Sequence, residues 1–405
     1  MNIAGLTARD VSPLFAATLV AIPGFLPGAW NGVVPPITRP GRHRRIDDYI
    51  SSQPWQQFGA GTVAIDLGCG FPPQTAVDLA VRFPEWQIVG VDPAFDPFLL
   101  YAGNELYACI AGSGQVRYFG RQPDAAADGF LKRIADHDST VRWLSELFVK
   151  LLPKLPSETD GEMSIAEADG SRLIRWPLKQ WESPNLTFIQ AGIGSRELPR
   201  ADLIRCCNVL FYYGASVRRE FETWAASVLN DGGVAITGSN SPNSTEARYE
   251  VYRKEGDAVN EKEFAFSVDN VRPSGVVSWF SMADDEPSSL RLAQVVGLIR
   301  SDAHYRSAFD ERLDELLRIN QLMVRDTDGH LTWAASDSLQ RVFTVETGVA
   351  VSEQLDRDGF TEDACSVLRR FGFTAWRNDA GCVAVEPSEF VSARSNLQRE
   401  PPSDR

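Results

Sequence analysis

Uninterrupted apolar runs alternate, through the middle of the chain, with segments whose apolar residues recur every three to four positions. Such runs predict buried strands, and the three-to-four spacing predicts helices with one buried face. The expected strands are residues 63–65, 86–91, 186–190, a run within 202–213, and 234–238; the expected helices are residues 74–83 and 217–228. This alternation is typical of an α/β fold with a doubly wound, mostly parallel sheet.

The segment between Asp92 and Leu186 is much longer than this pattern requires. A crossover between parallel strands needs a dozen or more residues. The segment contains a hairpin pattern at residues 107–120 and a helical pattern at residues 125–155. We expect an insertion at about 97–183. It is a candidate lid, because loops at the carboxyl edge of a parallel sheet border the ligand crevice; the alternative is a surface lobe with no ligand role.

A further module is expected after the last core strand. Residues 248–269 predict two strands around a turn at Gly256. Two amphipathic helices (292–299 and 309–317), a last helix (364–373) and a hairpin (374–387) follow, and we expect their apolar faces to pack internally. The expected domains are an N-terminal arm (1–60), a core (61–282) that carries the insertion, a C-terminal helical and hairpin module (283–390), and a flexible tail (391–405).

Charge and cysteine content narrow the function classes. The 405-residue chain has a formal net charge of −14, so a polyanion such as nucleic acid is not an expected partner. Its one dense cationic run, Arg42–Arg45, is expected to be a solvated loop. Six cysteines without a C-x-x-C spacing, and four histidines, predict neither a metal site nor a disulfide framework. Reduced, buried cysteines in a cytoplasmic protein are expected.

The apolar segment Leu14–Trp30 is short for a membrane span, and prolines and glycines interrupt it. Arg9 and Asp10 precede it, which is not the cationic flank of a signal peptide. We expect a helix and loop that pack over the core, and no membrane partner.

The sequence VAIDLGCGFPP, from Val63, places a glycine turn after the first strand. A dinucleotide site wants a third glycine where this chain has Pro73, and no G-K-[ST] follows as in a P-loop. Asp92 ends the next strand, where a carboxylate can accept hydrogen bonds from two ribose hydroxyls. A ligand with a ribose and a carboxylate but no phosphate fits these features, and S-adenosylmethionine is such a ligand.

At these residues the chain resembles the class I, seven-strand S-adenosylmethionine-dependent methyltransferases. The first signature of that family, an acid followed by G-x-G, matches Asp66, Gly68, Cys69 and Gly70. Its ribose-binding acid matches Asp92. The resemblance covers about residues 60–270 and implies S-adenosylmethionine as cofactor.

Two positions depart from the family pattern. The third glycine of the longer family pattern falls on Pro72. In the segment QAGIG, which matches the part of the family that brackets the adenine, the family often has an acid where this chain has Gly192. The resemblance then implies that backbone groups of Gly192 and Ile193 contact the adenine.

The fourth-strand sequence RCCNVLFYY resembles that of the chemotaxis receptor methyltransferases. This resemblance implies that Asn208 lies at the cofactor and Tyr212 near the transferred methyl. Tyr212, Tyr213 and His43 are candidate general bases, with roles as pocket wall or loop as the alternatives. The N-terminal helical domain of the chemotaxis enzymes is not recognisable in this chain.

The sequence therefore predicts a methyltransferase that acts on a small molecule by in-line displacement. A non-catalytic protein that binds an adenosyl ligand, an NAD-dependent oxidoreductase and a protein carboxyl methyltransferase are the alternatives. The residues favour no acceptor atom among oxygen, nitrogen, carbon and sulfur, and no oligomeric state.

Overall fold

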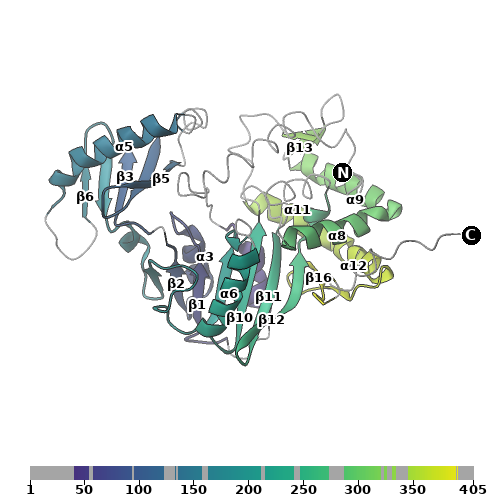
Figure 1. Ribbon diagram of the computed structural model, residues 1–405. Coiled ribbons are helices and arrows are strands. Elements are labelled where there is room, and N and C mark those ends of the chain that lie inside the picture. Colours follow the sequence, from purple (N-terminus) through teal and green to yellow (C-terminus); the bar gives the residue numbers. More distant parts are fainter. Residues whose placement is uncertain are drawn as a thin grey trace, which may run out of the picture. The chain divides into compact units, whose positions relative to one another are not determined.

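The computed structural model of the chain contains two compact units. Figure 1 labels the helices and strands of both. The structure describes residues 41–53, 58–93, 95–122, 133, 136–156, 163–210, 215–240, 247–272, 287–320, 323–325, 331–333, 345–388 and 390. The glycine-turn unit comprises residues 63–198, and the six-strand unit comprises residues 41–62 and the described residues from Pro199 onward. The domain limits expected from the sequence stay predictions.

Three parallel strands form the centre of the glycine-turn unit, in the order β1, β2, β8. These strands and the helix that follows the first are β1 (Val63–Leu67), α3 (Gln74–Arg82), β2 (Gln87–Val91) and β8 (Leu186–Ile189). All four elements were expected from the apolar pattern. Leu67 lies opposite Val91, and Val91 lies opposite Ile189, so the carboxyl ends of the three strands meet at one edge.

The insertion is a second sheet of five antiparallel strands with one helix beside it. The elements are β3 (Phe98–Ala102), β4 (Leu106–Ile110), β5 (Val116–Arg121), α5 (His137–Leu151), β6 (Met163–Ala166) and β7 (Arg172–Arg175), with short 3₁₀ helices at Leu152–Lys154 and Pro177–Trp181. Strands β4 and β5 are the expected hairpin. Helix α5 confirms part of the expected 125–155 helix, of which residues 125–132, 134 and 135 lie outside the described residues.

Alternate side chains of this insertion sheet point to opposite faces. Leu100 and Ala108 belong to an apolar cluster that includes Leu144 and Phe148 of α5. Tyr107 and the intervening residues Leu99 and Cys109 form a separate cluster with Phe71, directly after the glycine turn. Both faces of the insertion sheet are therefore covered within this unit.

A sheet with strand order β15-β16-β12-β11-β10-β9 organises the six-strand unit. Its elements in chain order are α2 (Arg44–Ser52), β9 (Ala201–Cys207), α6 (Ala215–Val228), β10 (Leu229–Asn240), β11 (Ala247–Glu255), β12 (Ala258–Phe266), β15 (Ala375–Arg377) and β16 (Val383–Val385). Strands β9 and β10 are parallel, and the others join antiparallel. The α/β class expected from the sequence is confirmed, and the strands predicted around Gly256 are β11 and β12.

Neighbouring residues of β11 show that helices cover both faces of this sheet. The Tyr249 ring packs 4.9 Å from that of Tyr49 on α2, whereas the Glu250 carboxylate binds Arg218 on α6. Adjacent strand residues point to opposite faces, so α2 and α6 lie on opposite sides. Strand β10 begins earlier than the expected Val234, because residues from Leu229 pair with β9 before a register shift.

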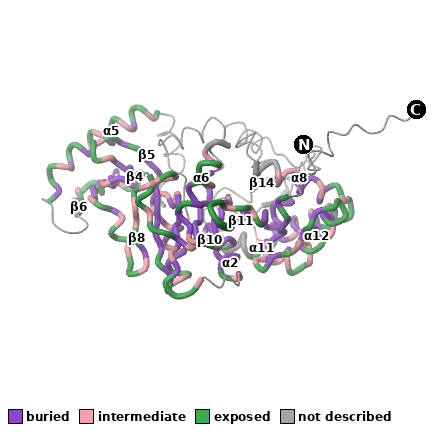
Figure 2. The backbone as a smooth tube through the Cα atoms, turned by 60° about the horizontal axis from the view of Figure 1, so that its bottom comes forward, coloured by how far each residue is buried: buried purple, intermediate pink, exposed green. Residues whose placement is uncertain are grey.

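Helices α8 (Pro287–Ser301), α9 (Ala303–Ile319), α11 (Val345–Arg357) and α12 (Phe360–Arg370) form an apolar core with β12, β15 and β16. Figure 2 shows buried stretches of the chain near the labels α8, α11 and α12. The helical faces expected around Leu292 and Phe309 are buried in it, as predicted. Helix α11, the 3₁₀ helix Val268–Val271, and the short strands β13 (Met323–Arg325) and β14 (Leu331–Trp333) were not expected.

The interpretation of Arg42–Arg45 as a solvated loop is wrong. The run leads into α2, and Arg42, His43 and Arg45 are buried. The Arg42 guanidinium donates to the Asn240 carbonyl at 3.3 Å, and that of Arg45 donates to the Ala380 carbonyl at 3.2 Å. Carbonyl groups from distant parts of the chain thus accept hydrogen bonds from Arg42 and Arg45 that water would accept in a solvated loop.

All six cysteines are buried and have free thiols, as expected. No helix among the described residues is both long and apolar enough to cross a membrane. The apolar segment 14–30 lies outside the described residues, and so does the flexible tail expected at 391–405.

Gly90 on β2 allows the close packing of the parallel strands. A Cβ at this position would lie 2.6 Å from the Phe188 ring and 3.3 Å from the Ala76 Cβ of α3. We expect Gly90→Ala to lower the free energy of unfolding by about 1–3 kcal/mol, because the core would be overpacked. Urea unfolding measures the change. The control is Gly59→Ala, whose Cβ meets no atom of the described chain within 4 Å; equal effects of the two variants would contradict the packing argument.

Candidate functional site

The glycine turn after β1 is held to the end of β2 by its backbone. The Gly68 amide donates to the Val91 carbonyl at 2.7 Å, and the Gly70 amide donates to the Asp92 Oδ2 at 2.9 Å. Gly68 and Gly70 have φ values of 76° and 68°, in the left-handed region that favours glycine. Local conformation therefore explains both glycines, and the Asp92 carboxylate points to the turn.

Asp66, near the end of β1, also holds the turn in place. Its buried carboxylate accepts a hydrogen bond from the Thr75 hydroxyl at 2.8 Å, in the first turn of α3. Cys69 is buried, with its Sγ 3.9 Å from the Val91 carbonyl oxygen. Asp66 thus ties strand β1 to helix α3, and the half-buried Gly68 and Gly70 form the bend between them.

The segment after β8 lies beside the same loop. A Cβ on Gly192 would lie 3.8 Å from the Pro93 Cβ, and the Gln190 side chain donates to the Pro93 carbonyl at 3.2 Å. Ile193 follows Gly192 and is half-buried. The structure brings the sequence-predicted residues of this unit to the carboxyl edge of three strands. These are Asp66, Gly68, Cys69, Gly70, Asp92, Gly192 and Ile193.

Asp96 is a residue of this site that the sequence analysis missed. Its buried side chain lies between β2 and β3, with Oδ1 3.5 Å from the Arg117 Nε. Burial raises the pKa of the Asp96 carboxyl to about 6, and the charge of Asp92 adds to this effect, whereas Arg117 opposes it. No local motif marks Asp96; its environment arises from the fold.

Apolar rings close the turn on the side of the insertion. Phe71 is buried, and its ring packs 5.3 Å from that of Trp181 and 6.0 Å from that of Tyr107. The Tyr107 hydroxyl donates to the Phe71 carbonyl at 3.3 Å. The insertion therefore contacts the bend directly, through Phe71, which follows Gly70.

Asn208 lies in the six-strand unit, at the end of β9, with a φ of 61° that asparagine tolerates. It forms a reciprocal pair with Asn240 at the end of β10: the Asn208 Nδ2 donates to the Asn240 carbonyl at 2.8 Å, and the Asn240 amide donates to the Asn208 Oδ1 at 3.2 Å. Tyr212 and Tyr213 lie outside the described residues.

His43 is connected to the same pair of asparagines. Its Nδ1 lies 2.9 Å from the Asn240 Oδ1, and the Asn240 Nδ2 donates to the Arg42 carbonyl. Because the Asn240 oxygen is the acceptor, the hydrogen-bond network assigns the ring proton to Nδ1. Burial, and then the charges of Arg205 and Arg42, hold the pKa of His43 well below 6.5. The ring is therefore neutral near pH 7 and can accept a proton at Nε2.

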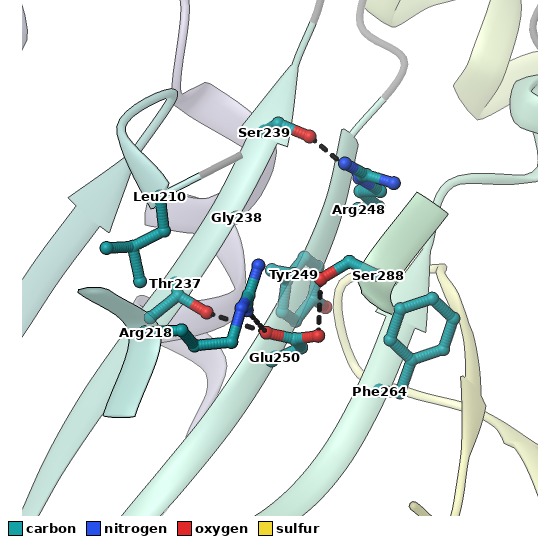
Figure 3. Close-up of a pocket in the computed structure, with 10 residues that line it drawn as sticks. All are labelled: Leu210, Arg218, Thr237, Gly238, Ser239, Arg248, Tyr249, Glu250, Phe264 and Ser288. Atoms are coloured by element: carbon teal, nitrogen blue, oxygen red, sulfur yellow. Dashed lines mark hydrogen bonds and ion pairs between the residues drawn. The ribbon is translucent and has the colours of Figure 1, made fainter. Parts of the chain in front are cut away.

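A cavity of about 10 Å³, with both polar and apolar side chains in its lining, lies between β10, β11, α6 and α8 (Figure 3). The buried Glu250 carboxylate binds Arg218 at 2.8 Å, accepts from Thr237 at 3.0 Å and also accepts from Ser288. A cavity of this size has room for about one water molecule. This cluster, which the sequence analysis also missed, ties two helices to the sheet.

No family model and no curated protein matches the chain. Among solved structures, it is similar to an O-methyltransferase family protein from Burkholderia thailandensis, with 14% identity and a TM-score of 0.22 over 48% of this chain and 37% of that one. It is also similar to the N-methyltransferase NodS from Bradyrhizobium japonicum, with 14% identity and a TM-score of 0.22 over 49% and 66% of the two chains.

A third similar structure is an O-methyltransferase family 2 protein from Planctomyces limnophilus in complex with apigenin. It has 14% identity and a TM-score of 0.23 over 47% of this chain and 37% of that one. The chain thus spans 37%, 66% and 37% of the lengths of these three proteins. Similarity of this extent assigns neither an activity nor a ligand to this chain.

The neutral state of His43 predicts a pH dependence of stability. Below about pH 6.5 the unfolded chain takes up a proton on this ring that the folded chain does not. We therefore expect the unfolding free energy to fall as the pH drops through this value. The control is His43→Asn, which keeps a hydrogen-bond donor for Asn240 but has no imidazole to titrate. The pH dependence of its unfolding free energy should lack the contribution of His43, whereas the contributions of the carboxyl groups are the same in both proteins. An imidazole NMR titration that finds the folded ring protonated at pH 6.5 would contradict the assignment.

Proposed function

We propose that this chain is an S-adenosylmethionine-dependent methyltransferase that transfers a methyl group to a small-molecule acceptor. The observation that carries the proposal is the hydrogen bond from the Gly70 amide to the Asp92 carboxylate. It holds an acid, suited to ribose hydroxyls, at a bend where backbone can approach a ligand closely. A Cβ at Gly70 would meet no atom of the described chain within 4 Å, so the space beside the bend is open.

The residues at this edge fit the parts of the cofactor. Asp92 would hold the ribose hydroxyls, and the backbone of Gly192 and Ile193 would contact the adenine. Asp66 keeps strand β1 and helix α3 in place around the bend. Carboxylates also favour a ligand that carries a sulfonium and an ammonium group.

When bound, S-adenosylmethionine supplies a methyl group that its sulfonium makes electrophilic. The task of the chain is then to hold the acceptor atom in line with the methyl carbon and sulfur. Such positioning contributes about 7–11 kcal/mol at best. An acceptor with a high pKa also needs a base. His43 is one candidate for this role, although the burial that lowers the pKa of its imidazole makes it a weak base. Tyr212 is the other candidate for this role, and Asn208 remains a candidate cofactor contact.

The bend argues against an NAD-dependent oxidoreductase. A dinucleotide needs backbone N–H donors for its pyrophosphate at the start of the helix. Here Pro72 and Pro73 have no N–H, and the Gly70 amide already donates to Asp92. A small acceptor, rather than a protein carboxylate, is favoured by the contact between the insertion and Phe71, which places a second sheet beside the bend.

Thermal unfolding with a panel of ligands tests the cofactor. We expect S-adenosylmethionine and S-adenosylhomocysteine to raise the melting temperature, since a ligand at a hundred times its Kd stabilises the folded state by about 2.7 kcal/mol. NAD should have no effect. Stabilisation by NAD alone would contradict the proposal. Binding of adenosyl ligands, with no turnover across a metabolite extract, would instead favour a regulatory protein.

Asp92→Asn tests the ribose contact. The asparagine can still accept from the Gly70 amide, but it presents a donor where the carboxylate would accept from the ribose. We expect about 10- to 100-fold weaker binding of S-adenosylhomocysteine in calorimetry. The control is Asp138→Asn on α5, whose side chain is 95% exposed. Unchanged affinity of the Asp92 variant would remove the ribose role.

A further inference from the structure

Asp96 carries a carboxylate oxygen that the fold leaves without a partner. Its side chain is 2% exposed, and only Oδ1 faces a cation, the Arg117 Nε at 3.5 Å. Within the described part of the chain, Oδ2 is buried and has no hydrogen-bond partner. Buried carboxylate oxygens without a donor are costly and rare in native proteins, so this atom needs an explanation.

The charge of Asp96 makes a buried oxygen without a hydrogen-bond donor more costly. With a pKa of about 6, raised chiefly by burial, most of the carboxyl groups are ionised at pH 7. Arg117 is half exposed and is too distant from Oδ1 for a short charge-assisted bond. Among the described residues, the charged groups that act on Asp96 are Arg117 on β5 and Asp92 at the end of β2. Neither donates to Oδ2, which leaves this oxygen able to accept a hydrogen bond from a bound molecule.

The position of Asp96 identifies that molecule. The residue lies in the loop that begins at Asp92 and Pro93, where Gly192 packs against Pro93 and the Asp92 carboxylate holds the Gly70 amide. A nucleoside bound at this edge would lie near Asp96, because the charge of Asp92 already acts on the Asp96 carboxyl. Nucleosides offer O–H donors on the ribose and an N–H donor on the adenine, and both suit a carboxylate.

We propose that Asp96 is a second nucleoside-binding carboxylate, whose Oδ2 accepts a hydrogen bond from the adenine amine or a ribose hydroxyl of the adenosyl ligand. This inference rests on the proposed function and adds a specificity-determining residue to its site. Arg117 positions the carboxylate through the other oxygen, so the insertion sheet contributes to recognition of the nucleoside.

Calorimetry with S-adenosylhomocysteine and three analogues tests the proposal. S-inosylhomocysteine lacks the adenine amine, and the 2′-deoxy and 3′-deoxy forms each lack one hydroxyl. We expect Asp96→Asn to bind S-adenosylhomocysteine about 10- to 100-fold more weakly. The variant should also lose the discrimination against one analogue that the unaltered protein shows. If the amine is the donor, the asparagine amide can donate to the inosine oxygen, and S-inosylhomocysteine should then bind the variant better than it binds the unaltered protein.

The controls separate the possible failures. If Asp96→Asn still binds a deoxy analogue more weakly than S-adenosylhomocysteine, the missing hydroxyl is a contact of Asp92. If Asp96→Asn discriminates against all three analogues as strongly as the unaltered protein does, Asp96 has no role in binding the nucleoside. Asp96→Ala repeats the comparison if the asparagine variant does not fold. If S-adenosylhomocysteine binds neither protein, the proposed function fails instead. Arg117→Gln removes the positioning cation but keeps Oδ2, so the discrimination should be weaker than in the unaltered protein and stronger than in Asp96→Asn. Unchanged discrimination in Arg117→Gln would remove the positioning role of Arg117.

Discussion

The hydrogen bond between the Gly70 amide and the Asp92 carboxylate is the interaction on which the candidate site depends. It joins the ends of two parallel strands and fixes both the bend and the acid that faces it. Only residues that tolerate a positive φ can turn the amide in this direction, which is why glycine stands at both bend positions. A hydrogen bond to a charged group contributes about 1.5–3 kcal/mol, enough to keep the bend in one conformation.

The sequence predicted the core strands and the bend because the signals for both are local. Buried strands are continuous apolar runs, and the glycines and acids at their ends are read directly from neighbouring residues. The carboxyl ends of parallel strands meet at one edge, so the sequence alone predicts that residues 66–70, 92 and 192 lie near one another. The structure confirms that these residues lie at one edge of the strands; it does not identify a ligand.

The parts that were missed arise from contacts between distant segments. His43 and Asn240 are 197 residues apart, and nothing near either residue indicates the other. For the same reason Arg42 and Arg45 resemble a solvated loop in sequence, although carbonyl groups of Asn240 and Ala380 receive them in the fold. Asp96 has an ordinary sequence context, and only the fold buries it.

The sheet of the insertion has consequences for how the chain can change over evolutionary time. One face of this sheet packs on α5 and the other on Phe71, so substitutions on either face alter a packed contact. A substitution at Tyr107 alters the surface against which the bend rests, so compensating changes at Phe71 and Trp181 should accompany it in descendants of this sequence. Length variation is tolerated better at exposed turns between its strands than within either packed face.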